Sequence, residues 1–484
     1  MVFNSIPFAV FFAGFFVLYW FVFKQNLKLQ NLLILIGSYA FYCWWDWRFL
    51  ALLIGSSLLN YYLGIFIAKS TIAKQRRLLL IAGMLQGIGG LLFFKYYNFF
   101  IGSFAELFSI FNVRLDVRTL QLILPLGISF YTFRTLSYLL DIDKGKIKPT
   151  TDWVVFFSYV AFFPSLFSGP IDRAKLLIPQ LEKKRAFEYA GMTDALRQIL
   201  WGLFKKIVVA DNCTAITNQV FDNYLQLPAS ALVLGALFYC IQLYADFSGY
   251  SDMAIGFARL LGFDITKNFN YPFFAQNIAD FWRRWHMSLT SWVTDYVFTP
   301  LSISFRDYGK VGLFFAILFN MVIVGLWHGA NWTYVLFGVL HGCYFIPMII
   351  KGTMNKRVKK TKATLIPSFT EFRNMAATFL LIMLTNILFR ADSITHAVDY
   401  YKHIVSRSIF SNPLVIEKTN TVIFLGFGFF MFFIEWIGRD QEYGIAAIGI
   451  KWPRIFRWSF YSFIIFLMAM FMSTSGSAFL YFKF

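Results

Sequence analysis

Long, almost uninterrupted apolar runs recur along this chain. A bilayer core of about 30 Å is crossed by about 20 mostly apolar residues in a helix. Backbone groups in lipid must hydrogen-bond within their own segment, so continuous runs of this length predict α-helices rather than alternating barrel strands. We predict an all-α polytopic fold of about 11–12 tilted spans, near residues 7–23, 31–46, 50–68, 78–98, 120–141, 194–210, 229–247, 312–328, 332–350, 374–389, 421–437 and 458–475.

Composition and charge agree with a membrane protein. Of the 484 residues, 58% are hydrophobic and 14% are charged, whereas soluble domains carry about 25% charged residues. The net charge of +19 would suggest nucleic-acid binding in a soluble protein. In a membrane protein such an excess marks cytoplasmic loops, so we expect lipid surroundings and no nucleic-acid partner.

The basic loops also predict an orientation. They follow the first, third, fifth and ninth predicted spans, and all fall on one side if the N-terminus is extracytoplasmic. The intervening segment 212–227 has no Lys or Arg. We therefore expect a multi-pass protein of the inner membrane with both termini extracytoplasmic. The residues concerned are Lys24, Lys28, Lys69, Lys74, Arg76, Arg77, Lys144, Lys146, Lys148, Lys351, Lys356, Arg357, Lys359, Lys360 and Lys362.

Two segments depart from this pattern. Residues 153–169 are apolar but have basic flanks on both sides, and Pro164 breaks the run. A re-entrant element explains this better than a full span. Residues 251–311 are too polar to span and too apolar for a free loop, which is typical of short interfacial and re-entrant helices. With no repeat or soluble region evident, we expect one membrane domain over residues 1–484.

Histidines are the first candidates for chemistry. His328 lies in GLWHGANW between two apolar runs, and an ionisable side chain at such depth is usually functional or turned inward to a partner. Two interpretations stay open for it: a catalytic group, or a buried histidine at a helix junction. His341, in the following LHG, is either a partner of the site or a structural residue.

The segment Phe281–Leu301, FWRRWHMSLTSWVTDYVFTPL, holds His286. On a continuous helix Trp285 would share a face with Trp282 and Trp292. This aromatic row is either an interface belt or, with Arg283 and Arg284, the wall of a cytoplasmic opening where Arg binds a phosphate-bearing ligand.

A third polar stretch is DFSGYSDMAIG, Asp246–Gly256. Asp246 and Asp252 could pair with Arg259, and Ser248 between them is a further candidate for substrate contact. Acidic pairs within a membrane also suit ion or proton coupling, which is the basis of a transporter interpretation. No phosphate-binding loop, GxSxG elbow, HExxH or other metal-ligand spacing is present, so we predict no metal site.

Seven blocks in order resemble the membrane-bound O-acyltransferase family. GLWHGANWTYVLFGVLHG, FWRRWHMSLTSWVTDYVFTPL and LYADFSGYSDMAIGFARLLGFDITKNFNYPF are similar to that family at large. PLGISFYTFRTLSYLLDI, FFPSLFSGPIDR, GLFKKIVVADN and NILFRADS are similar to its bacterial branch of alginate O-acetylases, which is related to the proteins of teichoic acid D-alanylation. The blocks extend from about residue 120 to residue 393.

The resemblance implies a ring of tilted helices with re-entrant segments around a funnel or tunnel. It implies acyl transfer from a cytoplasmic thioester to an acceptor on the far side. His328 matches the family's membrane-embedded catalytic histidine, with Trp327 beside it in the WHG pattern. His286 matches the second histidine of the bacterial branch. The chain departs from that branch at TPLSISFRD, where many relatives have a Gly-Gly pair, and this bears on the substrate.

The chemistry implied by the resemblance has two routes. A neutral His328 can remove the acceptor's hydroxyl proton as general base, or it can carry the acyl group as nucleophile. The sequence does not separate them. The developing oxyanion needs hydrogen-bond donors, for which Trp327, Asn331 and Arg284 are candidates by their proximity in sequence.

We therefore predict an O-acyltransferase that uses acetyl-CoA as substrate, with no tightly bound cofactor. It would O-acetylate a cell-surface polysaccharide or peptidoglycan together with a separate extracytoplasmic partner of the SGNH type. An alternative is D-alanyl transfer to teichoic acid from a carrier-protein thioester. Alternatives of other classes are a transporter or export channel, and a scaffold in which His328 only packs.

Overall fold

A computed structural model describes residues 1–113, 115, 119–354, 356, 365–413, 417–472 and 479–480. These residues form helices and connecting turns, without β-strands among them. The chain divides into two compact units. One comprises Met1–Met192 with Phe257–Thr266, and the other Thr193–Gly256 with Lys267–Phe484. The single domain expected over residues 1–484 stays a prediction.

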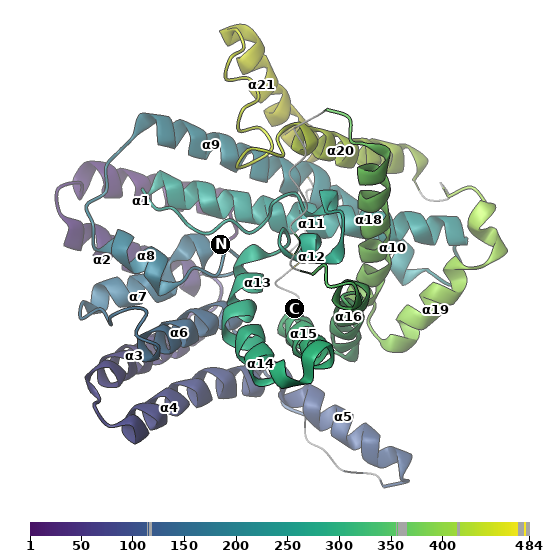
Figure 1. Cartoon of the computed structure of the whole chain (residues 1–484). Coiled ribbons are helices and arrows are strands. Elements are labelled where there is room, and N and C mark those ends of the chain that lie inside the picture. Colours follow the sequence, from purple (N-terminus) through teal and green to yellow (C-terminus); the bar gives the residue numbers. More distant parts are fainter. Residues whose placement is uncertain are drawn as a thin grey trace. The chain divides into compact units, whose positions relative to one another are not determined.

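The first unit contains α1 to α8 (Figure 1). Within it α3, α4 and α6 pack against one another, and α7 packs against α2 and α3. The bounds are α1 Ile6–Val17, α2 Leu27–Cys43, α3 Arg48–Lys69, α4 Ala73–Leu91, α5 Tyr97–Ile110, α6 Ile128–Asp143, α7 Trp153–Ala161 and α8 Ala174–Leu181.

Arg134 on α6 organises the turn after α7. Its side chain is fully buried, and its guanidinium donates to the carbonyl oxygens of Val160 at 3.1 Å and Ser165 at 2.8 Å. These bonds satisfy the backbone where α7 stops at Ala161 and gives way to a single 3₁₀ turn, Phe163–Ser165. The prediction that 153–169 is no full-length span is confirmed, since its helix has only nine residues.

The second unit holds most of α9 and the helices that follow. The longest is α11 with 32 residues, whose last residues reach the first unit. The bounds are α9 Tyr189–Phe204, α10 Asp211–Asp222, α11 Ala229–Leu260, α12 Ile278–Trp282, α13 Met287–Val293, α14 Thr299–Ser304, α15 Gly309–His328, α16 Trp332–Cys343, α17 Ile346–Ile350, α18 Phe369–Arg390, α19 Ile394–Ile404, α20 Lys418–Ile437 and α21 Arg454–Phe471.

The all-α polytopic membrane fold is confirmed. Eight helical stretches among the described residues are long and apolar enough to cross a membrane, and three shorter apolar helices accompany them. The eight are Arg48–Lys69, Ala73–Ile110, Ala229–Leu260, Arg306–His328, Trp332–Ile350, Phe369–Arg390, Lys418–Ile437 and Arg454–Phe471, and the shorter ones are Ile6–Val22, Leu27–Cys43 and Trp153–Ser165.

Two predicted spans are not among these stretches. In 120–141 the helix begins only at Ile128, because Pro125 lacks a backbone N–H and Gly127 adopts a left-handed conformation with φ 75°. The helix predicted at 194–210 forms as α9 and a π-helical continuation, Lys205–Ala210. It carries the charged side chains of Lys205 and Lys206 inward to acidic partners, which explains its lower hydropathy.

The segment 251–311 is partly corrected by the structure. Its first ten residues continue α11 to Leu260, while the rest forms the short helices α12, α13 and α14, as expected. The continuous helix considered for Phe281–Leu301 is wrong. The chain turns between α12 and α13, where His286 has φ 43° and ψ 53°, a left-handed conformation that non-glycine residues seldom adopt. Trp282, Trp285 and Trp292 therefore do not share one helical face.

Helices α15 and α16 form a tight hairpin in the second unit (Figure 1). They approach backbone to backbone at two glycines. A Cβ atom on Gly325 would lie 2.1 Å from the carbonyl oxygen of Tyr334, and one on Gly338 would lie 2.5 Å from that of Met321. Small residues allow such close packing of helices in membranes.

We expect Gly338→Ala to destabilise the protein. The added methyl group would displace the backbone of α15, and overpacking of this kind costs about 1–3 kcal/mol. The midpoint of thermal unfolding in detergent should therefore fall. Gly426→Ala on α20 is the matched control, since a Cβ there meets no atom within 4 Å and Ala gains about 0.5–1 kcal/mol over Gly in a helix. A Gly338→Ala midpoint at or above that of the wild type would contradict the close-packing interpretation.

Candidate active site

His328 is the last residue of α15 and is 3% exposed. Its imidazole packs edge-on against two aromatic rings, with centroids 5.0 Å from Trp327 and 4.8 Å from Phe389 of α18. The helix stops here because Gly329 takes an extended conformation and Asn331 caps α16. The hairpin thus presents an imidazole at the C-terminal end of α15, where helix carbonyls favour positive charge.

His341 lies on α16 and is fully buried. Its Nδ1 accepts a 3.2 Å hydrogen bond from the indole Nε1–H of Trp282. Its ring also contacts Phe337, with centroids 4.3 Å apart. His341 and His328 line the same small cavity, which has about 320 Å³ of empty space with its open side included. Aromatic and aliphatic side chains form most of its wall, and Asn386 is a further polar lining residue; the apolar ones are Leu243, Phe281, Trp282, Trp285, Phe337, Ile382 and Phe389.

His286 is held by Asn268. The Oδ1 atom of Asn268 lies 3.1 Å from His286 Nδ1 and accepts a 2.7 Å hydrogen bond from the hydroxyl of Ser288. The backbone N–H of Ser288, which can only donate, also points to this atom at 3.4 Å. Oδ1 is therefore the amide oxygen, so Nδ1 of His286 carries the proton and Nε2 is the basic nitrogen.

The indole ring of Trp327 contacts the imidazoles of both His286 and His328. Its centroid lies 5.4 Å from that of His286 and 5.0 Å from that of His328. Burial lowers the pKa of His286 to about 3, so its imidazole is neutral at physiological pH. The rings of Trp327, His328 and His286 therefore lie close together, and the neutral imidazole of His286 supplies a basic nitrogen at Nε2.

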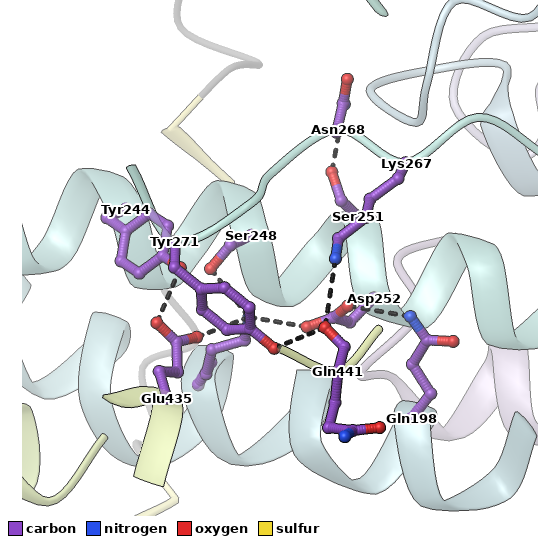
Figure 2. A network of polar contacts seen from close by, with 11 residues as sticks. Gln198, Tyr244, Ser248, Ser251, Asp252, Lys267, Asn268, Tyr271, Glu435 and Gln441 are labelled. Atoms are coloured by element: carbon purple, nitrogen blue, oxygen red, sulfur yellow. Dashed lines mark hydrogen bonds and ion pairs between the residues drawn. The ribbon is translucent and has the colours of Figure 1, made fainter. Parts of the chain in front are cut away.

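A second polar group lies on α11 and its neighbours (Figure 2). The ammonium of Lys205 contacts Asp252 at 2.6 Å, Ser248 at 2.9 Å and Glu435 at 3.5 Å. The hydroxyl of Tyr244 donates to Glu435 at 2.7 Å. These contacts neutralise buried charge within the protein.

This polar group corrects one pairing predicted from the sequence. Asp246 and Asp252 pair with Lys206 and Lys205, at 2.8 Å and 2.6 Å, rather than with Arg259. Asp246 and Ser248 do not line the cavity of His328. Among the residues searched, no group of three His, Cys, Asp or Glu could hold a metal ion.

The remaining candidates take other positions. Trp285 lines the cavity of His328. Arg284 is bound to Asp280 at 3.0 Å, and Arg283 donates to the carbonyl oxygen of Met354 at 2.8 Å. Asn331 caps α16 through Thr333 N–H and donates to the Asp392 carbonyl. Arg284 and Asn331 thus have structural partners, which weakens their candidacy as oxyanion donors.

Sequence reasoning missed three residues of the site. Asn268 and Trp282 each hold a histidine, and Phe389 packs on His328. Each lies inside a block that carried the family resemblance. Their residue types alone gave no signal, because an Asn in a loop or a Trp near a membrane surface is common.

Comparison with known proteins agrees with this geometry. The sequence model of the MBOAT, membrane-bound O-acyltransferase family matches residues 39–389. The probable alginate O-acetylase AlgI of Pseudomonas aeruginosa is 36% identical over 84% of this chain and 75% of its own length. The peptidoglycan O-acetyltransferase of Helicobacter pylori is 32% identical over 81% and 77%. The teichoic acid D-alanyltransferase of Streptococcus thermophilus is 31% identical over 60% and 75%. A match of this extent, with two buried histidines around one small cavity, shows that the chain belongs to the membrane-bound O-acyltransferase family.

Proposed function

We propose that this O-acyltransferase transfers acetyl groups from acetyl-CoA to a hydroxyl of a cell-surface polysaccharide or peptidoglycan. The observation that carries the proposal is the small, mostly aromatic cavity in which His328 and His341 meet. A narrow apolar wall beside an imidazole suits a short acyl group. The relatives named for alginate and peptidoglycan O-acetylation match more of this chain than the D-alanyltransferase does.

In the proposed mechanism, His328 accepts a proton from the acceptor hydroxyl and later donates it to the leaving thiolate. Its neutral imidazole takes the proton of the acceptor hydroxyl as the hydroxyl oxygen forms a bond to the acetyl carbon. The tetrahedral intermediate then collapses, the carbon–sulfur bond breaks, and the proton passes to the thiolate of CoA. The positive charge that His328 carries in between is stabilised by the C-terminal end of α15. An acetyl-histidine route is the alternative, with His328 as nucleophile.

His286, which also contacts Trp327, supplies a second basic nitrogen. Asn268 fixes its tautomer, so that Nε2 can accept a proton or a hydrogen bond from an acceptor hydroxyl. We assign His286 a catalytic role on this basis, and Asn268 the role of its positioning residue.

The location and partner are part of the proposal. We place the protein in the inner membrane with both termini extracytoplasmic, as the basic loops indicate. The acetyl group is passed to a separate extracytoplasmic transferase of the SGNH type, which completes the modification. The family relationship and the distribution of basic residues support both statements.

The first test measures release of free CoA from acetyl-CoA by the purified protein in lipid nanodiscs, with crude cell envelope as acceptor. We expect acceptor-dependent turnover by the wild type. His328→Ala should lower it by about 10²–10⁴-fold, the usual contribution of general-base catalysis.

Each outcome of this test is informative. Full activity of a folded His328→Ala variant would remove His328 from the mechanism. No turnover by the wild type, even with partner and acceptor present, would disfavour acetyl-CoA as donor. A D-alanyl carrier-protein thioester would then be supplied in the same assay.

The second test changes the charge beside His286. In Asn268→Asp the carboxylate keeps the acceptor oxygen but favours the protonated imidazole, which raises the pKa of His286 by about 1–3 units. Because a protonated histidine cannot act as base, an acid limb should appear in the pH–rate profile between about pH 4 and 6, with activity recovering toward pH 8. The wild type has its His286 pKa near 3 and should lack this limb.

Ser288→Ala is the matched control for this profile. It removes the other side chain that donates to Asn268 Oδ1 but leaves the contact with His286 intact, so its profile should follow the wild type. Superimposable profiles for Asn268→Asp and the wild type would show that His286 does not act as a base.

A further inference from the structure

The hydrogen bond between Trp282 and His341 fixes where the imidazole proton lies. An indole N–H can only donate, so Nδ1 of His341 must be the unprotonated nitrogen that accepts at 3.2 Å. In the neutral ring the proton is then on Nε2. The structure thus defines His341 as an N–H donor at Nε2.

This N–H has no protein acceptor in the described part of the chain. Nε2 of His341 is buried and makes no hydrogen bond there, while the residue as a whole is fully buried. Leaving a buried donor unsatisfied costs about 1–3 kcal/mol, so such an atom calls for a functional explanation. The ring lines the cavity that it shares with His328.

The other polar lining residue, Asn386, has a partner for one of its two amide N–H groups. Asn386 donates through Nδ2 to the thiol sulfur of Cys240 at 3.3 Å. Trp282 uses its N–H on His341. The rest of the wall apart from Trp285 and His328 is hydrocarbon: Leu243, Phe281, Phe337, Ile382 and Phe389. In such apolar surroundings one directed N–H interacts strongly with a negative oxygen.

We propose that His341 is a catalytic residue whose Nε2–H binds the carbonyl oxygen of the acyl group in this cavity, and that Trp282 is its positioning residue. The ligand class is a short acyl thioester. This inference rests on the proposed function and adds to it the oxyanion donor, in place of the sequence-based candidates Asn331 and Arg284. His328 and His341 then have opposite roles, as proton acceptor and hydrogen-bond donor.

Bond formation, bond breaking and proton transfer are coupled in this acyl-transfer step. The acceptor oxygen bonds to the acyl carbon and its proton moves to His328, while the π electrons of the carbonyl shift onto oxygen. That oxyanion receives the hydrogen bond from His341, which keeps its proton throughout. When the carbonyl reforms, the carbon–sulfur bond breaks and the thiolate takes the proton from His328. Preorganised donors stabilise such an oxyanion more than the ground-state carbonyl.

Variants of His341 that differ in whether and where they place a side-chain N–H donor test this role. Removal of one oxyanion donor costs about 10²–10³-fold in kcat, so His341→Phe should lose that much with the KM for acetyl-CoA nearly unchanged. His341→Gln, which places an amide N–H near the Nε2 position, should recover part of the loss. His341→Asn, whose amide nitrogen lies near the Nδ1 position instead, should recover less. Trp282→Phe releases the tautomer and should lower kcat by a smaller factor.

A binding measurement keeps the test independent of turnover. In the His328→Ala background, infrared spectroscopy of acetyl-CoA labelled with ¹³C at the carbonyl carbon reports hydrogen bonding to the thioester oxygen. We expect the carbonyl stretch of bound acetyl-CoA to lie at lower frequency than that of free acetyl-CoA. In His328→Ala/His341→Phe the shift should be lost while acetyl-CoA still binds.

The outcomes distinguish failure of the His341 role from failure of the proposed acetyl transfer. Bound acetyl-CoA with the same carbonyl frequency in both variants would overturn the role of His341 and leave acetyl transfer intact. Equal kcat for His341→Phe and wild type would do the same. Absence of acetyl-CoA binding to the His328→Ala variant, together with absence of wild-type turnover, would instead refute acetyl-CoA as the donor.

Discussion

The close contact between α15 and α16 is the constraint on which the site depends. Gly325 and Gly338 have no side chain, and backbone atoms of the neighbouring helix occupy the space that a side chain would need. The hairpin therefore brings the end of α15 and the last turn of α16 close to α18, with His328 and His341 around one cavity. A bulkier residue at either glycine would move both imidazoles at once, so packing and chemistry are coupled here.

His286 and His341 each have one hydrogen-bonding partner that defines the tautomer of the buried imidazole. Asn268 offers an oxygen to His286, whereas Trp282 offers an N–H to His341. The two histidines are therefore held in opposite tautomers, with the basic nitrogen at Nε2 in one and at Nδ1 in the other. Lys205 and Lys206 can likewise be buried because carboxylates neutralise their charge. Lys205 pairs with Asp252 and Glu435, and Lys206 pairs with Asp246.

Much of the fold could be predicted because a membrane-spanning helix is marked by a continuous run of apolar residues, which is a local property of the sequence. The spans near 50–68, 312–328 and 374–389 correspond to α3, α15 and α18. Where local signals compete, prediction failed: Gly127 delays the start of α6, and His286 interrupts the helix expected over 281–301. The left-handed conformation of His286 depends on contacts with Asn268, which lies 18 positions earlier.

The site was predictable in its residue types but not in its pairing. The sequence blocks made His328, His286 and Trp285 candidates, whereas Arg259, the partner considered for the acidic residues of α11, is replaced by Lys205 and Lys206. Which side chain meets Asp246, or which N–H reaches His341, is decided by helices far apart in the chain. The periodicity of the sequence does not reveal such contacts, because they arise only when the π-helical segment Lys205–Ala210 lies against α11 and α12 lies against α16.

The mostly hydrocarbon wall of the cavity has a further consequence, which concerns competition rather than catalysis. An activated acyl group is open to attack by any hydroxyl, and water is the most abundant one. A cavity lined by Phe337, Phe389 and Ile382 offers water few hydrogen-bond partners. Under the proposed function, a thioester bound there would be shielded from water until a larger acceptor supplies its own hydroxyl. The aromatic wall would then favour productive transfer over hydrolysis.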